Sequence, residues 1–394
     1  MQGLLGLDRR IAVVVGANFL AIAARMSLVQ FLGIYFSHRV GLDVALIGFG
    51  FLCESLARGL LAPMFGALSD RVGRRVLLLF SALGTAVILP CFLLVDGPAA
   101  LLIWSIALGT TGAINMPVAS ALLLDLAPPD RRQSVLALNY TGMSVAYTLG
   151  VVPAGFIAEQ GYGFLAASSA AGYVLVALLY ASALRGPLPM EKAAAESSVV
   201  RDTLSTFLDP RFVLFAGIAF VFPLSMGMLV LASPLWSADA GLKEGYIGMV
   251  LGANSIIVAV LALPVATRIE SHGPFRYLGL AGAIVAAALA CYALVPSAAM
   301  ALVAGTIVYS FGEVIFSSAV PAAVARLAPP GRRGAYQGGW TLVASLAMGS
   351  ALVLCGLISK AAGWPVAWLA GAGLALVAAA ALFVLREHFV SRAS

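Results

Sequence analysis

The ten residues Gly66–Arg75, with the sequence Gly-Ala-Leu-Ser-Asp-Arg-Val-Gly-Arg-Arg, form a short charged link between two long apolar runs. Val44–Leu68 is the run before the charges, and Val76–Val95 is the run after them. Each has the roughly 20 apolar residues that a helix needs to cross the hydrocarbon core of a bilayer. A loop with three arginines is typical of the cytoplasmic side of a membrane protein. That rule does not account for the aspartate or the two glycines of the link.

The composition of the whole chain is that of a membrane protein. Of its 394 residues, 62% are hydrophobic and 10% are charged, whereas soluble domains carry about 25% charged residues. The pI of 9.3 does not indicate a nucleic-acid partner, because the arginines lie in short loops between apolar runs, where they set topology. We therefore expect the lipid bilayer to be the main partner, and we expect no nucleic acid.

Cysteine and histidine usage argues against metal, redox and catalytic sites. The cysteines all lie inside apolar runs, and no Cys-x-x-Cys pair is present. The three histidines lie near span ends or in loops, with no nucleophile–base arrangement. No Walker A lysine motif is present. We expect no metal, no cofactor, no enzymatic activity and no direct use of ATP by this chain.

Apolar runs of similar length recur and predict an all-α integral membrane protein with twelve transmembrane helices. The predicted spans are 11–37, 44–68, 76–95, 99–125, 134–158, 163–184, 211–237, 245–267, 276–295, 298–325, 334–359 and 364–385. The first run is too long for a cleaved signal peptide. The polar stretch Arg185–Asp209 separates spans six and seven. We expect an N-terminal half at 1–184, a cytoplasmic linker at 185–210 and a C-terminal half at 211–394.

The basic residues predict the orientation. With both termini in the cytoplasm, eighteen of the 23 basic residues lie in cytoplasmic segments, and only Arg39, Lys243 and Lys360 lie in outer loops. This imbalance predicts a multi-pass protein of the cell membrane with both termini in the cytoplasm.

The two halves repeat at an offset of about 200 residues. Leu126–Arg132 reads Leu-Ala-Pro-Pro-Asp-Arg-Arg, and Leu327–Arg333 reads Leu-Ala-Pro-Pro-Gly-Arg-Arg. Ile47-Gly48 likewise returns as Ile247-Gly248. Two six-span halves related in this way are the architecture of secondary transporters, which bind substrate near the bilayer midplane between the repeats.

The charged link resembles the G-x-L-x-D-R-x-G-R-[RK] signature of the major facilitator superfamily, at the place between spans two and three where that family keeps it. The matching residues are Gly66, Leu68, Asp70, Arg71, Gly73, Arg74 and Arg75. The resemblance extends over the full length and implies alternating access, with Gly66, Asp70, Arg71, Gly73, Arg74 and Arg75 as a conformational gate. It implies that Asp70 pairs with Arg74 and meets the N-terminal end of span eleven near Gly334.

The chain resembles the drug–proton antiporter branch of that family in part. Ser105 stands four residues before Gly109, where members often carry an arginine. Val152 precedes Pro153, where the antiporter signature of span five has a glycine. These departures weaken the antiporter interpretation without excluding it.

Five charged residues fall within apolar runs, where a charge costs about 2.5–3.5 kcal/mol or more at a helix centre. Asp125, at the cytoplasmic end of span four, is expected at the membrane interface. Arg25, Glu54 and Glu313 fall near the midplane, and Arg58 lies one turn from Glu54 on the same helix face. An internal Glu54–Arg58 ion pair would ease membrane insertion. Alternatively, Glu54 is a proton or cation site whose protonation breaks a pair with Arg58 or Arg25.

Glu313 has no charged neighbour within a turn of its own helix. Such a carboxyl group either protonates or finds a partner on another span. The resemblance implies that spans one, four, seven and ten line a central cavity, and it brings Arg25, Asn115 and Glu313 near one another. We regard Glu313, Glu54, Arg25 and Arg58 as candidates for a proton or charge relay.

Uncharged candidates for the cavity lie on spans that the resemblance turns inward. They are Phe31, Tyr35, Asn115, Tyr140, Phe222, Met226, Met228, Asn254, Tyr309 and Trp340. Aromatic and methionine side chains suit a bulky amphipathic substrate. In membrane helices the same side chains also serve as packing.

These features together favour a monomeric, proton-coupled secondary transporter that exports amphipathic small molecules or drugs across the cell (inner) membrane. The alternative is a proton-coupled carrier of a metabolite or lipid, working as a symporter or flippase. A channel fits less well because channels usually need rings of ligands from several subunits. A membrane-embedded enzyme lacks a catalytic constellation.

Overall fold

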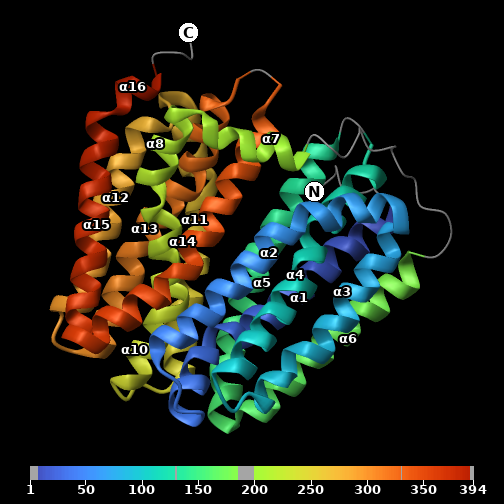
Figure 1. Ribbon diagram of the computed structural model, residues 1–394, viewed down its shortest axis with the longest axis horizontal. Helices are drawn as coiled ribbons and strands as arrows, with labels where there is room; N and C mark the ends of the chain where they lie inside the picture. The colour runs from blue at the N-terminus through green and yellow to red at the C-terminus, as the bar shows by residue number, and fades with distance from the viewer. Residues whose placement is uncertain (1–7, 129–130, 185–198, 330, 391–394) are drawn as a thin grey trace.

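The computed structural model describes residues 8–128, 131–184, 199–329 and 331–390, with helices throughout (Figure 1). The first half consists of α1 (Arg9–Ile34), the π-helical turn η2 (Tyr35–Arg39), α2 (Val44–Val72), α3 (Arg74–Ile88), the 3₁₀ segment η3 (Leu89–Leu94), α4 (Pro98–Leu126), α5 (Arg132–Gln160) and α6 (Tyr162–Ala183). A connecting segment, α7 (Val199–Ser205) and η5 (Thr206–Leu208), follows. The second half consists of α8 (Pro210–Ala219), α9 (Val221–Gly227), the π-helical turn η6 (Met228–Ala232), α10 (Ser233–Asp239), α11 (Glu244–His272), α12 (Phe275–Leu294), α13 (Ala298–Leu327), α14 (Arg333–Ala362), α15 (Trp364–Val384) and the short α16 (Arg386–Val390).

These helices confirm the all-α membrane fold and place a helix at every predicted span. Within the described residues, 11 segments are long and apolar enough to cross a membrane. The remaining predicted span, 134–158, coincides with α5, which has 29 residues. Span seven is built by α8, α9, η6 and α10 in succession, whereas spans one and three each end in one non-α segment, η2 or η3. Single π-helical turns inside helices often occur at functional sites.

The repeat seen in the sequence is also a repeat of structure. α2 and α11 each have 29 residues and contain a proline, Pro63 or Pro264. Each ends at a glycine with a left-handed backbone, Gly73 with φ 101° and Gly273 with φ 86°. A side chain at either position would strain the backbone, so glycine ends the helix at the same point in both halves.

The two halves meet through two pairs of helices, α2 with α14 and α5 with α11. The helices approach closely at glycines. Gly48 of α2 lies against the backbone of α14 at Leu352 and Val353, and Gly356 of α14 lies against α2. Gly155 of α5 and Gly248 of α11 make the matching approach in the second pair. Small residues allow helices to pack in lipid without a hydrophobic driving force.

The halves are in contact at one end of the molecule and diverge toward the other (Figure 1). We call these the α10 end and the α7 end, after the helices that lie there. Gly48 lies near the start of α2, and Gly155 and Gly356 lie near the ends of α5 and α14, where these helices connect to the loops of the α10 end. This conformation is therefore closed at the α10 end.

Polar contacts between the halves hold the α10 end together. His38 Nε2 lies 2.7 Å from Asp239 Oδ1. Lys360 Nζ donates to Asp43 Oδ2 at 2.6 Å. That bond from Lys360 holds the pKa of Asp43 below its ordinary value of 3.8. We refer to these two contacts, with the backbone N–H of Gly245 that donates to Glu159 Oε1 at 2.8 Å, as the α10-end contacts.

The predicted linker is described only in its second part. Residues 185–198 lie outside the described residues. The following α7 and η5 pack on the start of α14, where Arg332 donates to Ser205 and to the carbonyl oxygen of Asp202. Tyr336 Oη donates to Asp209 Oδ2 at 2.6 Å. The exact division into 1–184, 185–210 and 211–394 stays a prediction.

Candidate functional site

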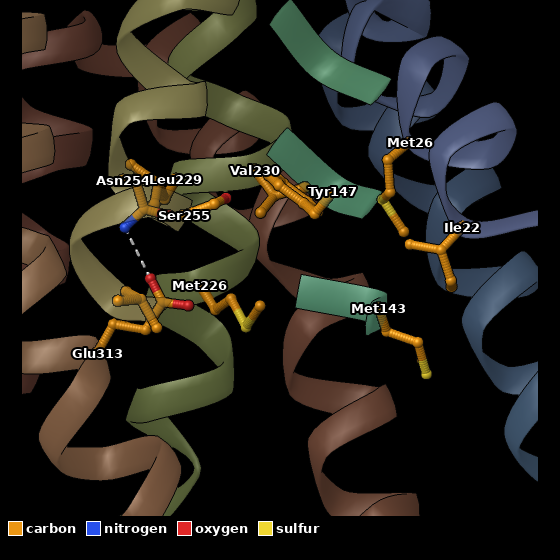
Figure 2. Close-up of a pocket in the computed structure, with 11 residues that line it drawn as sticks. Ile22, Met26, Met143, Tyr147, Met226, Leu229, Val230, Asn254, Ser255 and Glu313 are labelled. Atoms are coloured by element: carbon orange, nitrogen blue, oxygen red, sulfur yellow. Dashed lines mark hydrogen bonds between the residues drawn. The ribbon is translucent and has the colours of Figure 1, made fainter. Parts of the chain in front are cut away.

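A cavity of about 260 Å³ lies between the two halves (Figure 2). Its walls come from α1 and α5 of the first half, and from span seven, α11 and α13 of the second. The lining residues are Ile22, Met26, Met143, Tyr147, Met226, Leu229, Val230, Asn254, Ser255, Val258 and Glu313. Three of them are methionines, whose flexible side chains adapt to varied apolar ligands.

Glu313 is the one charged side chain among the described residues that line the cavity. Asn254 Nδ2 donates to Glu313 Oε2 at 2.9 Å and to Ser310 Oγ at 3.0 Å (Figure 2 shows the first bond). Both N–H groups of the amide are thereby used, which fixes the side chain of Asn254 and the carboxyl group beside it. A buried amide thus positions a single carboxyl group at the wall of an apolar cavity.

A second group of charges lies inside the first half, and we call it the Arg25 cluster: Arg25, Glu54 and Arg58. Arg25 of α1 forms an ion pair with Glu54 of α2, and both side chains are 7% exposed. Arg58 Nη2 lies 3.6 Å from the other carboxylate oxygen of Glu54. Gly112 of α4 leaves room for this arrangement, because a Cβ there would lie 3.2 Å from Arg25 Nη1.

Arg25, Asn115 and Glu313, which the family resemblance brings near one another, each bond to a different partner in this structure, so their grouping in one cavity stays a prediction. The contacts of Arg25 and of Glu313 are with Glu54 and with Asn254, respectively. Asn115 belongs to a third group, in which its Nδ2 donates to Asn18 Oδ1 at 3.1 Å. Tyr180 Oη lies 3.1 Å from the amide oxygens of both asparagines. A sequence pattern could not show these groupings, since every partner comes from a different span.

The uncharged candidates divide between the cavity and the interior. Met226 and Asn254 line the cavity. The side chain of Tyr140 lies outside the described residues. The other candidates pack within the halves in this structure: Phe31 and Met228 in the core, Tyr35 against Phe92 and Tyr162, Phe222 stacked on Phe316, Tyr309 near Ser225, and Trp340 near Phe215.

Several lining residues were not among the candidates. Met143 and Tyr147 share a face of α5 one turn apart, and Met26 directly follows Arg25 on α1. Tyr147 Oη donates to Gln30 Oε1 at 2.8 Å. The i, i+4 spacing of Met143 and Tyr147 was a visible signal, but nothing in the sequence shows which face of span five turns toward the other half.

The gate residues lie at the α7 end of α2 and at the start of α3 (Figure 1). Arg74 Nε lies 2.6 Å from Asp125 Oδ2, and both side chains are 6% exposed. Arg75 Nη2 donates to the carbonyl oxygen of Ala181 at 3.1 Å. Gly66 packs near Pro117 of α4, and Arg71 is exposed. The side chain of Asp70 lies outside the described residues, so its expected contacts with Arg74 and with the start of span eleven stay predictions.

Comparison with known proteins identifies the family. The chain is 25% identical over 348 residues to an uncharacterized MFS-type transporter, YqjV, of Bacillus subtilis (strain 168), covering 83% of this chain and 80% of that one. It is 26% identical over 232 residues to the multidrug resistance protein MdtG of Salmonella paratyphi A, covering 57% and 56%.

Solved structures with the same fold include the nucleoside transporter NupG, with a TM-score of 0.81 at 14% identity over 96% of this chain and 100% of that one. A bacterial homologue of the human lysosomal transporter Spinster, in an inward-facing and occupied conformation, has a TM-score of 0.79 at 16% identity over 97% of both chains. The Major Facilitator Superfamily model matches residues 14–274 and 215–394. The chain is thus a transporter, not an enzyme, and it belongs to the Major Facilitator Superfamily.

Proposed function

We propose that this transporter exports amphipathic, positively charged small molecules in exchange for protons, and that Glu313 is the group for which substrate and proton compete. The observation that carries the proposal is a single carboxyl group at the wall of an apolar, methionine-containing cavity between the two halves. Apolar walls favour the body of an amphipathic molecule, and the carboxylate favours its positive charge. The name of the multidrug relative supports the same class of substrate.

Coupling follows if Glu313 cannot hold a proton and a cation at once. A carboxyl group in such a cavity is an expected proton carrier. Binding of either partner must favour one conformation over the other, or no coupling results. In the proposed cycle, the α10-end contacts open and the α7 end closes while Glu313 exchanges one partner for the other.

Orientation and assembly belong to the same proposal. The bias of basic residues supports an orientation with the α7 end and both termini in the cytoplasm. The conformation closed at the α10 end would then be the one that receives substrate from the cytoplasmic side. The transporter works as a monomer of the cell membrane, with the linker at 185–210 on the cytoplasmic face.

Purified protein in liposomes tests the role of Glu313. A panel of amphipathic cations is offered with and without an imposed pH gradient. Glu313→Gln keeps the size and a hydrogen-bonding group but cannot titrate. It should abolish gradient-driven uphill transport while leaving downhill movement of the substrate. Glu270→Gln is the matched control, because Glu270 is an exposed acid at the end of α11.

Uphill transport by Glu313→Gln at the wild-type rate would refute the proposal. If Glu54→Gln alone lost uphill transport, the Arg25 cluster would be the proton switch. A gradient that drives transport in the symport direction would replace export by uptake.

A further inference from the structure

The Arg25 cluster carries more positive than negative charge at the depth of the cavity. It contains two guanidinium groups and one carboxylate. Because an unbalanced charge at this depth is costly, a surplus cation in a membrane span is an indication of function. The two guanidinium groups also have N–H donors that no hydrogen bond within the described residues uses.

Both arginines retain unused hydrogen-bond donors. Arg25 Nε and Nη1 are buried and make no well-aligned hydrogen bond within the described part of the chain, although the hydroxyl group of Tyr173 also lies beside Arg25. Arg58 makes no hydrogen bond to any described residue, and its closest carboxylate oxygen, on Glu54, is 3.6 Å away. An arginine side chain offers five N–H donors in a planar fork that matches carboxylate, sulfonate and phosphate groups. Arg58 is therefore free to bind an anion without giving up an existing hydrogen bond.

The position of Arg58 on α2 indicates where its exposed part points. Ile47, Phe51, Glu54 and Arg58 follow one another at the spacing of a single helix face. The first three are at most 5% exposed, whereas the side chain of Arg58 is 35% exposed. Exposure along this face of α2 thus begins at Arg58, midway along the helix.

The other faces of α2 are accounted for. Gly50 and Ala57 contact α4, and Gly48 and Gly59 contact α14. Leu60, on the opposite side, is 60% exposed, as expected for a lipid-facing residue. The side of α2 that carries Arg58 lies between the side that packs on α4 and the side that packs on α14. The exposed part of the Arg58 side chain therefore faces the space between the halves.

The internal repeat gives an independent indication. At the offset of 200 that relates α2 to α11, Glu54 corresponds to Asn254 and Arg58 corresponds to Val258. Both Asn254 and Val258 line the cavity. The pseudo-symmetry of the halves therefore directs Arg58 toward the same central space from the opposite side.

We propose that Arg58, supported by Arg25, is an anion subsite for a carboxylate, sulfonate or phosphate group carried by the transported molecule. The inference rests on the proposed function and narrows it: the preferred substrate is a zwitterionic amphipath with its positive group at Glu313 and its negative group at Arg58. Such a substrate bridges the two halves. It also neutralises the surplus charge of the Arg25 cluster while it is bound.

Matched probes test the subsite on the purified full-length protein in nanodiscs. One probe is benzyltrimethylammonium, and the others are benzyldimethylammonio-alkanesulfonates of increasing spacer length, which add a sulfonate to the same cationic group. Affinities are measured by calorimetry. The best sulfonate probe should bind about tenfold more tightly than the cation, as expected for one added charge-assisted hydrogen bond.

Variants separate the subsite from general effects. Arg58→Gln should remove the preference for the sulfonate probe and leave the affinity for the plain cation unchanged. Arg58→Lys, which keeps the charge but not the fork, should retain part of the preference. Arg276→Gln, at an exposed arginine of α12, is the matched control and should change neither affinity.

The outcomes also separate this inference from the proposed function. Glu313→Gln should weaken both probes but preserve the ratio of their affinities. Equal binding of all probes by the wild type, or an equal loss for both probe types in Arg58→Gln, would overturn the anion subsite while leaving export of cations intact. Tight binding of free propanesulfonate, with no preference for the joined probe, would show a site for free anions and would also overturn it.

Discussion

The helices α2 and α11 have the same length and the same glycine ending, yet they carry different chemistry at corresponding positions. α2 presents Glu54 and Arg58, where α11 presents Asn254 and Val258. In the first half, the carboxylate lies between two guanidinium groups. In the second half, the carboxyl group sits on the neighbouring helix α13 and is held by an amide.

The difference shows how one fold can hold one carboxyl group for structural stability and another for the exchange of protons and substrate. Breaking the ion pairs of a carboxylate with two arginines would leave buried cations without a counter-ion. The carboxylate of Glu54 therefore links α1 firmly to α2. A carboxyl group held by a neutral amide can exchange its proton for a substrate cation, and neither form leaves a buried arginine without its counter-ion. The two halves thus share the same backbone geometry, but their buried charged residues have different roles.

Removing the carboxylate of Glu54 should have the largest effect on stability. Glu54→Gln keeps the shape but leaves Arg25 and Arg58 without a counter-ion, and breaking a buried pair in this way costs about 3–5 kcal/mol. Glu313→Gln should cost about 1 kcal/mol or less, because the glutamine oxygen can still accept from Asn254. Thermal unfolding of the purified variants in detergent measures both. Equal losses would mean that the two halves hold their carboxyl groups in the same way.

Substitutions in the packing contacts between the halves should have similar effects in both halves, unlike the substitutions of the two carboxyl groups. Gly155 and Gly356 occupy corresponding positions and each touches the backbone of the opposite half. Leucine at either position would overfill a tight contact, which typically costs about 1–3 kcal/mol, and should keep the α10 end from closing.

We expect Gly155→Leu and Gly356→Leu to reduce transport to a similar extent. Distances between spin labels at Asp96, in the loop before α4, and at Ala361, in the last turn of α14, should lengthen in both variants. Gly373→Leu is the control, because a Cβ at Gly373 would meet no atom within 4 Å. A strong effect at only one of the two glycines would show that the helix pairs do not close together.

The smallest effect should come from the exposed pair between Asp43 and Lys360, whose side chains are 39% and 71% exposed. Exposed pairs of this kind contribute about 0–1 kcal/mol. Because pairing lowers the pKa of Asp43, the contribution is present above the ordinary value of 3.8 and is lost as pH falls through the lowered value.

Lys360→Met should therefore shift the Asp96–Ala361 label distances only slightly, and by the same amount throughout the neutral pH range. A difference between wild type and Lys360→Met that varies across that range would mean that another titrating group acts through this contact.

The sequence alone determined the elements of the fold and their order. Apolar runs and charged links are consequences of local chemistry and of the thickness of the bilayer, so the twelve spans and the repeat could be predicted. The i, i+4 relation of Glu54 and Arg58 was visible for the same reason, because both lie on one helix.

Only the tertiary structure decided which residues from different helices meet. The rotation and tilt of each span depend on close contacts such as those at Gly48 and Gly155, and these contacts have no local signature. That is why Arg25 was found with Glu54, and why Asp125, expected at the membrane interface, lies in a buried pair with Arg74. Pairing across helices is a property of the whole packing arrangement, and a charged residue in lipid takes whichever partner that arrangement brings within reach.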